Sequence, residues 1–144
     1  MKKISSMSLI VLMIILLASF PTLGQAAESI KLGVTEPLSG TFKNIGDRYL
    51  EGVQYAAKVL NRQGGVLGRM IEVIPIDSEL KPDVATRKAT ALILKDQVKF
   101  FCGGTGSSVG AAMSTVAEQN NAIMFSYGMD AASLTGQKCN KNFF

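Results

Sequence analysis

The sequence predicts an α/β domain built on a Rossmann-like parallel sheet. Short apolar segments alternate with amphipathic helical segments from residue 30 onward, which is the pattern of a parallel sheet covered by helices on both faces. A proline inside the second strand removes a ladder donor, so this strand is expected at an edge of the sheet. With right-handed crossovers, these observations favour the strand order 2-1-3-4-5.

The first 26 residues have the pattern of a secretory signal peptide. Lys2 and Lys3 precede an apolar run over residues 7–20, and small residues at Gly24 and Ala26 suit cleavage after Ala26. A transmembrane anchor is the alternative, but fourteen helical residues extend only about 21 Å, short of a hydrocarbon core of about 30 Å. No cysteine stands at the cleavage site, so a lipid anchor is not expected.

The first half of the mature chain predicts two strands and one helix. Residues 30–35 alternate apolar and other side chains as a strand does, and residues 71–77 form the second strand, interrupted by Pro75. A helix is expected from about residue 46 to residue 62, ended by Gly64-Gly65. Its apolar face is predicted at Leu50, Val53, Ala57 and Leu60.

The second half continues the alternation. Pro82 is placed to open a second helix, a third strand covers residues 98–102, a third helix covers 107–120, and a fourth strand covers 122–125. The residues expected to face inward from these two helices are Ala85, Ala89, Leu92, Ile93, Val109, Ala112, Met113 and Val116. Asn142-Phe143-Phe144 begins a fifth strand, so we expect the 144 residues to be the N-terminal part of a longer protein.

Composition excludes several function classes. The chain has no histidine, which removes imidazole bases and imidazole metal ligands from this stretch. Loss of Lys2 and Lys3 with the signal peptide lowers the net charge from +4 to +2, and no basic stripe indicates nucleic-acid binding. No metal or cofactor site is predicted. Cys102 and Cys139 lie at opposite ends of the predicted sheet, so whether they pair with each other, pair elsewhere or stay free is left open.

The loop after the third strand is the best candidate for a ligand site, because open α/β sheets bind ligands outside the carboxyl ends of their strands. Residues 103–108 read Gly-Gly-Thr-Gly-Ser-Ser, and the glycines let backbone approach a ligand closely. Ser107 stands at the expected N-cap of the third helix, where unpaired amides attract an anion. With the hydroxyls of Thr105 and Ser108, this loop suits a carboxylate. The alternative is that Ser107 only caps its own helix.

Three other interpretations of the sequence concern a hydrolase nucleophile, a nucleotide-binding loop and a pair of catalytic carboxylates. Gly106-Ser107-Ser108-Val109-Gly110 matches the G-x-S-x-G pattern of a hydrolase nucleophile elbow, although no upstream Gly-rich oxyanion loop accompanies it. No dinucleotide fingerprint or Walker loop is complete. Asp77 and Glu79 are better explained as a solvated helix entrance than as a pair of catalytic carboxylates.

The chain resembles periplasmic solute-binding proteins of the branched-chain amino-acid ABC transporter type, with a leucine-binding-protein-like type I fold. The resemblance lies in residues 30–40 (Ile-Lys-Leu-Gly-Val-Thr-Glu-Pro-Leu-Ser-Gly) after the signal peptide, in residues 51–57 and 60–68, and in the loop at 103–108. It implies that residues 27–144 are the N-terminal lobe of a two-lobed protein, ending at the start of the fifth strand. It further implies no catalysis, no cofactor, a monomer in full length, and a periplasmic or extracellular location.

The resemblance also assigns ligand-binding roles to individual residues of this sequence. The resemblance implies that Ser107 and the amides after it hold a ligand carboxylate, and that Gly128 and Asp130 hold the positive or polar group. The family often has an aromatic residue where this chain has Ile45, and Tyr127 offers a replacement surface. The predicted function is capture of an amino acid or similar small carboxylate for an ABC permease. A sensor ectodomain with the same lobe and the hydrolase remain as alternatives.

Overall fold

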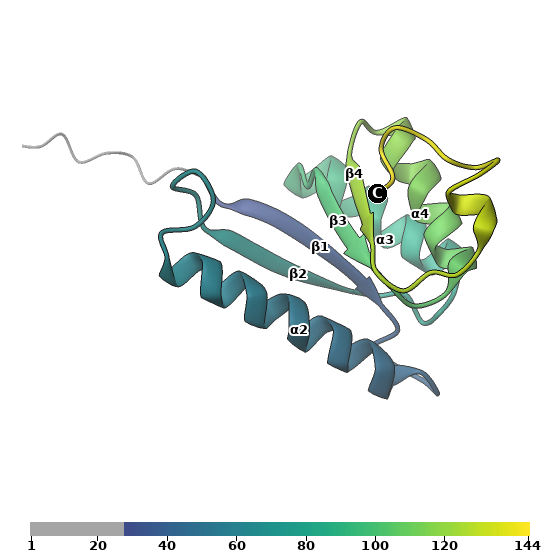
Figure 1. Ribbon diagram of the computed structural model, residues 1–144, viewed down its shortest axis with the longest axis horizontal. Coiled ribbons are helices and arrows are strands. Elements are labelled where there is room, and N and C mark those ends of the chain that lie inside the picture. The colour runs from purple at the N-terminus through teal and green to yellow at the C-terminus, as the bar shows by residue number, and fades with distance from the viewer. Residues whose placement is uncertain (1–27) are drawn as a thin grey trace, which may run out of the picture.

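The computed structural model describes residues 28–144, so the predicted signal peptide lies outside the described residues. Figure 1 shows a parallel sheet with helix α2 on one face and helices α3 and α4 on the other. The elements in chain order are β1 (Ile30–Glu36), α2 (Lys43–Arg62), β2 (Ile71–Asp77), α3 (Pro82–Asp96), β3 (Phe100–Gly103), α4 (Ser107–Gln119), β4 (Ile123–Ser126) and a short 3-10 turn η1 (Ala132–Leu134).

The strand order is β2-β1-β3-β4, and every pair is parallel. Among the strands of residues 28–144, β2 pairs only with β1, and Pro75 lies opposite Val34, so the edge position predicted from this proline is confirmed. A parallel bridge joins Phe143 to Met124 of β4, with the Phe144 amide donating to the Met124 carbonyl at 2.9 Å. The predicted order is confirmed for the four observed strands as 2-1-3-4, and the bridge at Phe143 lies beside β4, where the fifth strand is expected.

The main core lies between the sheet and helices α3 and α4. Phe101, Met113 and Met124 are fully buried there, each contributing roughly 1.5–3 kcal/mol through removal of its side chain from water. The Phe101 ring lies directly on Gly33, where an added Cβ would stand 2.5 Å from its Cδ1 atom. A side chain at position 33 would displace this ring, so β1 requires a glycine opposite β3.

Helix α2 differs from its prediction in its first residue and in the exposure of Leu60. It begins at Lys43, three residues before the predicted start, because residues 43–45 are exposed and show no apolar periodicity that marks them as helical. Leu60, predicted to face inward, is instead 39% exposed. The predicted end is confirmed: Gly64 and Gly65 have φ of +97° and +76°, and the Gly65 amide donates to the Leu60 carbonyl.

The sheet face that carries α2 is partly open beside that helix. Phe101 and Met124 point into the main core, so their strand neighbours Phe100 and Phe125 point to the opposite face, where both are exposed. Phe125 lies 6.0 Å from Phe144, ring centre to ring centre. Among residues 28–144, no helix is both long enough and apolar enough to cross a bilayer.

Candidate functional site

A buried carboxylate lies at the carboxyl edge of the sheet. Glu36, the last residue of β1, is 0% exposed, and it accepts three hydrogen bonds. The donors are the Gly104 amide at 2.7 Å, the Thr105 hydroxyl at 2.5 Å and the Tyr127 hydroxyl at 2.6 Å. One side chain therefore joins the end of β1 to the β3–α4 loop and to the segment after β4.

The groups around Glu36 are held in their neutral forms. Burial, then the hydrogen bond to Glu36 and its charge, raise the pKa of Tyr127 above its ordinary range. Burial, followed by the charge of Glu36, raises the pKa of the Cys102 thiol to about 12. Tyr127 consequently acts as a hydrogen-bond donor at neutral pH, and Cys102 stays a thiol.

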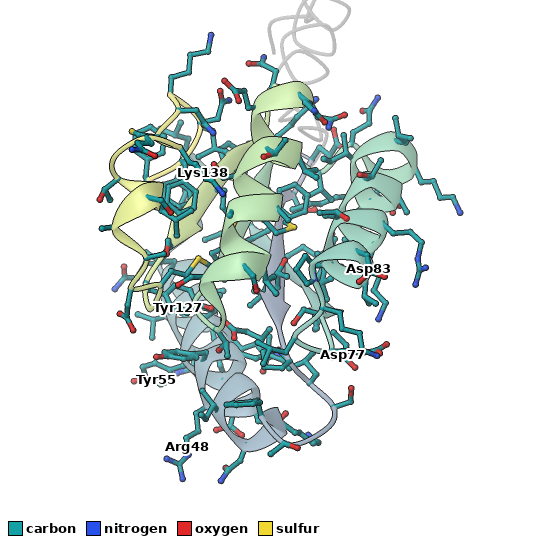
Figure 2. All side chains as sticks on the ribbon, turned by 90° about the vertical axis from the view of Figure 1, so that its right-hand side faces the viewer. Arg48, Tyr55, Asp77, Asp83, Tyr127 and Lys138 are labelled. Carbon is teal, nitrogen blue, oxygen red and sulfur yellow. The ribbon has the colours of Figure 1, made fainter. Side chains whose placement is uncertain are left out.

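The segment after β4 is attached to the β3–α4 region at three points. The Tyr127 ring covers Gly104 so closely that a Cβ there would overlap the ring. The Met129 side chain occupies the space that Gly110 leaves open on α4. The Ala131 amide donates to the Ser107 hydroxyl oxygen at 3.2 Å. Figure 2 shows the labelled Tyr127 at the end of α4 that faces α2.

Ser107 is not the N-cap of α4, so that prediction is wrong by one residue. Gly106 is the cap, with φ of +88°, and Ser107 is the first helical residue, with no side-chain capping bond. The hydroxyl instead accepts the bond from Ala131, so the alternative that Ser107 only caps its own helix is also wrong. The first bond of α4 runs from the Gly110 amide to the Gly106 carbonyl, so the amides of residues 107–109 have no acceptor within the helix.

The other predicted site residues lie around this helix end. Ser108 is exposed in the first turn of α4, and Asp130 is exposed beside Ala131. Thr105 donates its hydroxyl proton to Glu36. Gly128 lies beside the Gly104 carbonyl and the Tyr49 hydroxyl, which stand 3.0 and 3.1 Å from an ideal Cβ at position 128.

Ile45 lies on α2, 46% exposed, and Tyr49 follows it one turn later. The Tyr49 ring contacts the Tyr127 ring, with centres 5.0 Å apart and planes inclined at 45°. The aromatic surface on this side of the site is thus the Tyr49–Tyr127 pair. Sequence reasoning missed Tyr49, although its spacing of four from Ile45 places both on one helix face.

Sequence reasoning also missed Glu36 as a site residue. The only signal in the sequence was a charged residue at the carboxyl end of the first predicted strand, the edge at which open α/β sheets bind ligands. Its three donors lie 68, 69 and 91 residues further along the chain. No local pattern reveals such distant partners.

The geometry of the Gly106–Gly110 segment differs from a nucleophile elbow. Such an elbow places the serine itself in a strained strand-to-helix turn. Here Ser108, the serine of the pattern, belongs to the first turn of α4, and the positive φ is at Gly106. The second glycine of the pattern, Gly110, is accounted for by its contact with Met129.

Asp77 ends β2 at the same edge and Glu79 follows it in the turn before α3; Glu79 is solvated as predicted, whereas Asp77 is half-buried. Asp77 accepts bonds from the Leu38 and Glu79 amides, both at 2.9 Å, while the exposed Glu79 pairs with Lys81. Partial burial works to raise the pKa of Asp77, but those two amides, the Ser39 hydroxyl and the charge of Lys88 outweigh it and hold the pKa below its ordinary value. Asp77 therefore stays ionised and ties the β1–α2 loop to the end of β2.

The cysteines and the acidic residues make no bridge or cluster in the part of the chain that the structure describes. Cys102 is buried and Cys139 is exposed, and both are free. Residues 28–144 contain no group of three or more Cys, Asp or Glu side chains arranged to hold a metal ion.

Comparisons with known proteins agree with this architecture. The family model "Periplasmic binding protein" matches residues 29–144. The chain is 27% identical, over 84% of its length, to the leucine-, isoleucine-, valine-, threonine- and alanine-binding protein of Pseudomonas aeruginosa, and covers 32% of that protein. The chain thus spans about a third of the length of the relatives that it matches.

Solved structures give the same result. A branched-chain amino acid transporter substrate-binding protein from Streptococcus pneumoniae, in complex with isoleucine, is 26% identical with a TM-score of 0.74, covering 81% of this chain and 33% of that one. A solute-binding protein of an ABC transporter from R. palustris, in complex with benzoate, is 28% identical with a TM-score of 0.70, covering 81% of this chain and 32% of that one. With the family model matched over residues 29–144, the chain belongs to the periplasmic binding protein family.

Proposed function

We propose that residues 27–144 are the N-terminal lobe of the extracytoplasmic solute-binding component of an ABC transporter. The lobe captures an amino acid or similar small carboxylate against a second lobe, and the full-length monomer delivers it to the permease in the membrane. Residues 1–26 export the protein to the periplasm or the exterior. The relatives are solute-binding proteins, which supports binding without catalysis.

The observation that carries the proposal is the free donor set at the start of α4. The amides of residues 107–109 have no intrahelical acceptor, and the helix dipole adds partial positive charge at this end. A hydroxyl has one proton and two lone pairs, and Ser107 uses only a lone pair, on the Ala131 amide. Its proton has no acceptor among residues 28–144, so it is available to a ligand carboxylate.

The charges at this edge favour a ligand that also carries a positive group. Residues 103–108 and 126–131 contain no Lys or Arg, whereas Asp130, two residues after Gly128, is exposed. A carboxylate here attracts an ammonium and repels a second anion. Amino acids are therefore the first expected class of ligand and simple carboxylates the second. The isoleucine and benzoate complexes of the two neighbours represent these two classes.

Calorimetric titration of the full-length protein with the common amino acids and with benzoate-type acids tests the proposal. We expect saturable one-to-one binding of at least one amino acid, with the ligand recovered chemically unchanged afterwards. Failure to bind any member of either class would reject the proposed ligand. Conversion of the ligand to a product would reject the non-enzymatic role.

A further inference from the structure

We propose that Glu36 is the positioning residue of the ligand site, fixing in advance the two segments that carry the ligand-binding groups. The inference rests on the proposed function, because it concerns the same site at the start of α4 and after β4. It goes beyond that function by assigning a role to a buried carboxylate that would not itself contact the ligand.

The hydrogen bonds of Glu36 reach both segments. Oε1 accepts from the Gly104 amide and from the Tyr127 hydroxyl, and Oε2 accepts from the Thr105 hydroxyl. Thr105 is two residues before Ser107, and Tyr127 directly precedes Gly128. Two of the proposed ligand contacts, Ser107 and Gly128, are therefore within two residues of a group that Glu36 holds.

The Tyr127 ring extends this attachment to helix α2. Its hydroxyl is held by Glu36, one part of its ring lies on Gly104, and the ring also contacts Tyr49. The hydroxyl of Tyr49 stands beside Gly128. Glu36 thus fixes the aromatic surface of the site as well as its backbone donors.

The cost of burying this charge argues against a merely structural role. A buried carboxylate loses much of its hydration, and among the described residues Glu36 has no ion-pair partner to compensate. Well-packed apolar side chains serve stability as well as buried charged groups do, or better. What the carboxylate adds is a fixed position for its three donors, because hydrogen bonds to an ionised acceptor are shorter and stronger than neutral ones. Segments fixed in this way need less ordering when a ligand binds, which favours affinity.

The test compares Glu36→Gln with Glu72→Gln in the full-length protein. Both changes replace a carboxylate by an amide, but Glu72 is exposed at the opposite end of the sheet, where it pairs in register with Lys31. We expect Glu36→Gln to weaken binding of the best ligand about tenfold, equivalent to about 1.4 kcal/mol, and Glu72→Gln to leave it unchanged. Glu36→Ala should weaken binding further, because it removes all three acceptor contacts. Affinities are measured well below the unfolding temperature of each variant.

A double-mutant cycle with Tyr127→Phe provides a readout that fold stability alone does not move. Phe keeps the ring on Gly104 and removes only the hydroxyl that donates to Glu36. The fold-loss of affinity caused by Glu36→Gln should then be at least three times smaller in the Tyr127→Phe background than in the wild-type background. In a tyrosinate absorbance titration, the ionisation of Tyr127 is the one that disappears in Tyr127→Phe. It should occur above the ordinary pH range of tyrosine in the wild type, and at lower pH in Glu36→Gln.

The outcomes separate the two proposals. If Glu36→Gln lowers the unfolding temperature but leaves affinity unchanged, while Ser107→Ala weakens binding, the positioning role is overturned and the proposed function stands. Additive effects in the cycle also overturn it. If the wild type binds no ligand, the proposed function fails. The positioning of Tyr127 by Glu36 is then upheld if the Tyr127 ionisation occurs at lower pH in Glu36→Gln than in the wild type, and overturned if the two proteins titrate alike.

Discussion

Met129 packs into the side of α4 at Gly110, in space that even a methyl group would fill. This contact anchors the segment after β4 between its two other attachments, at Tyr127 and at Ala131. The proposed ligand groups at Gly128 and Asp130 flank Met129 in sequence. A glycine within a helix, which is unfavourable for the helix itself, thus serves the placement of a neighbouring loop.

Gly110→Ala is the first prediction. The added methyl displaces Met129, and the overpacking should lower the free energy of unfolding by about 1–3 kcal/mol and weaken ligand binding. Gly52→Ala on α2 is the matched control, because nothing lies within 4 Å of its added Cβ, and it should stabilise the protein by about 0.5–1 kcal/mol. Urea unfolding and calorimetry measure both effects. Equal stability of the two variants would contradict the proposed contact.

The second prediction concerns Asp77 and acid. Its pKa is lower in the folded protein than its ordinary value of 3.8, so its ionised form stabilises the fold above that pH. This contribution should decline as the pH falls through 3.8 and disappear below the folded pKa. Asp77→Asn should therefore destabilise the protein at pH 7, and its difference from the wild type should shrink in acid.

The control for this pH series is Asp96→Asn. Asp96 is an exposed carboxylate at the last residue of α3, and its side chain accepts no hydrogen bond within the described residues. Denaturant unfolding from pH 7 down to pH 3 checks both variants. A constant offset of Asp77→Asn at every pH would be evidence against the network around Asp77.

The third prediction is that the two thiols differ strongly in reactivity. With a pKa of about 12, only about one Cys102 thiol in ten thousand is ionised at pH 8, and the residue is buried. Cys139 is exposed and should react rapidly with a thiol reagent, while Cys102 should react only when the protein unfolds. Labelling of Cys139→Ser reports Cys102 alone, and the difference between the wild type and this variant reports Cys139. Resistance of both to labelling after unfolding would indicate a disulfide instead.

Much of the fold could be predicted because it depends on local patterns. Pro75 placed β2 at the edge, Gly64-Gly65 ended α2, and the apolar periodicity of α3 and α4 identified Ala85, Ala89, Val109 and Met113, all of which are buried. The exposed residues 43–45 of α2 had no such pattern, so the start of this helix was placed too late.

The interior of the site could be predicted only in part. The loop at 103–108 and Ser107 were identified because glycines and a serine before a helix have local meaning. The bond from Ala131 to Ser107 spans 24 residues, and those to Glu36 span 68 to 91, so neither follows from neighbouring residues. The role of Glu36 therefore follows only from the folded arrangement, whereas Tyr49 could have been found from its spacing of four from Ile45 on α2.

The most direct test of the central claim is the affinity of Ser107→Ala for the best amino-acid ligand, measured by calorimetry on the full-length protein. Loss of the hydroxyl removes a donor to the ligand carboxylate, and a hydrogen bond to a charged group contributes about 1.5–3 kcal/mol, so binding should weaken by tenfold or more. Thr115→Ala removes an exposed hydroxyl two turns along the same helix and should leave affinity unchanged. Unchanged affinity in Ser107→Ala would contradict carboxylate binding at the start of α4.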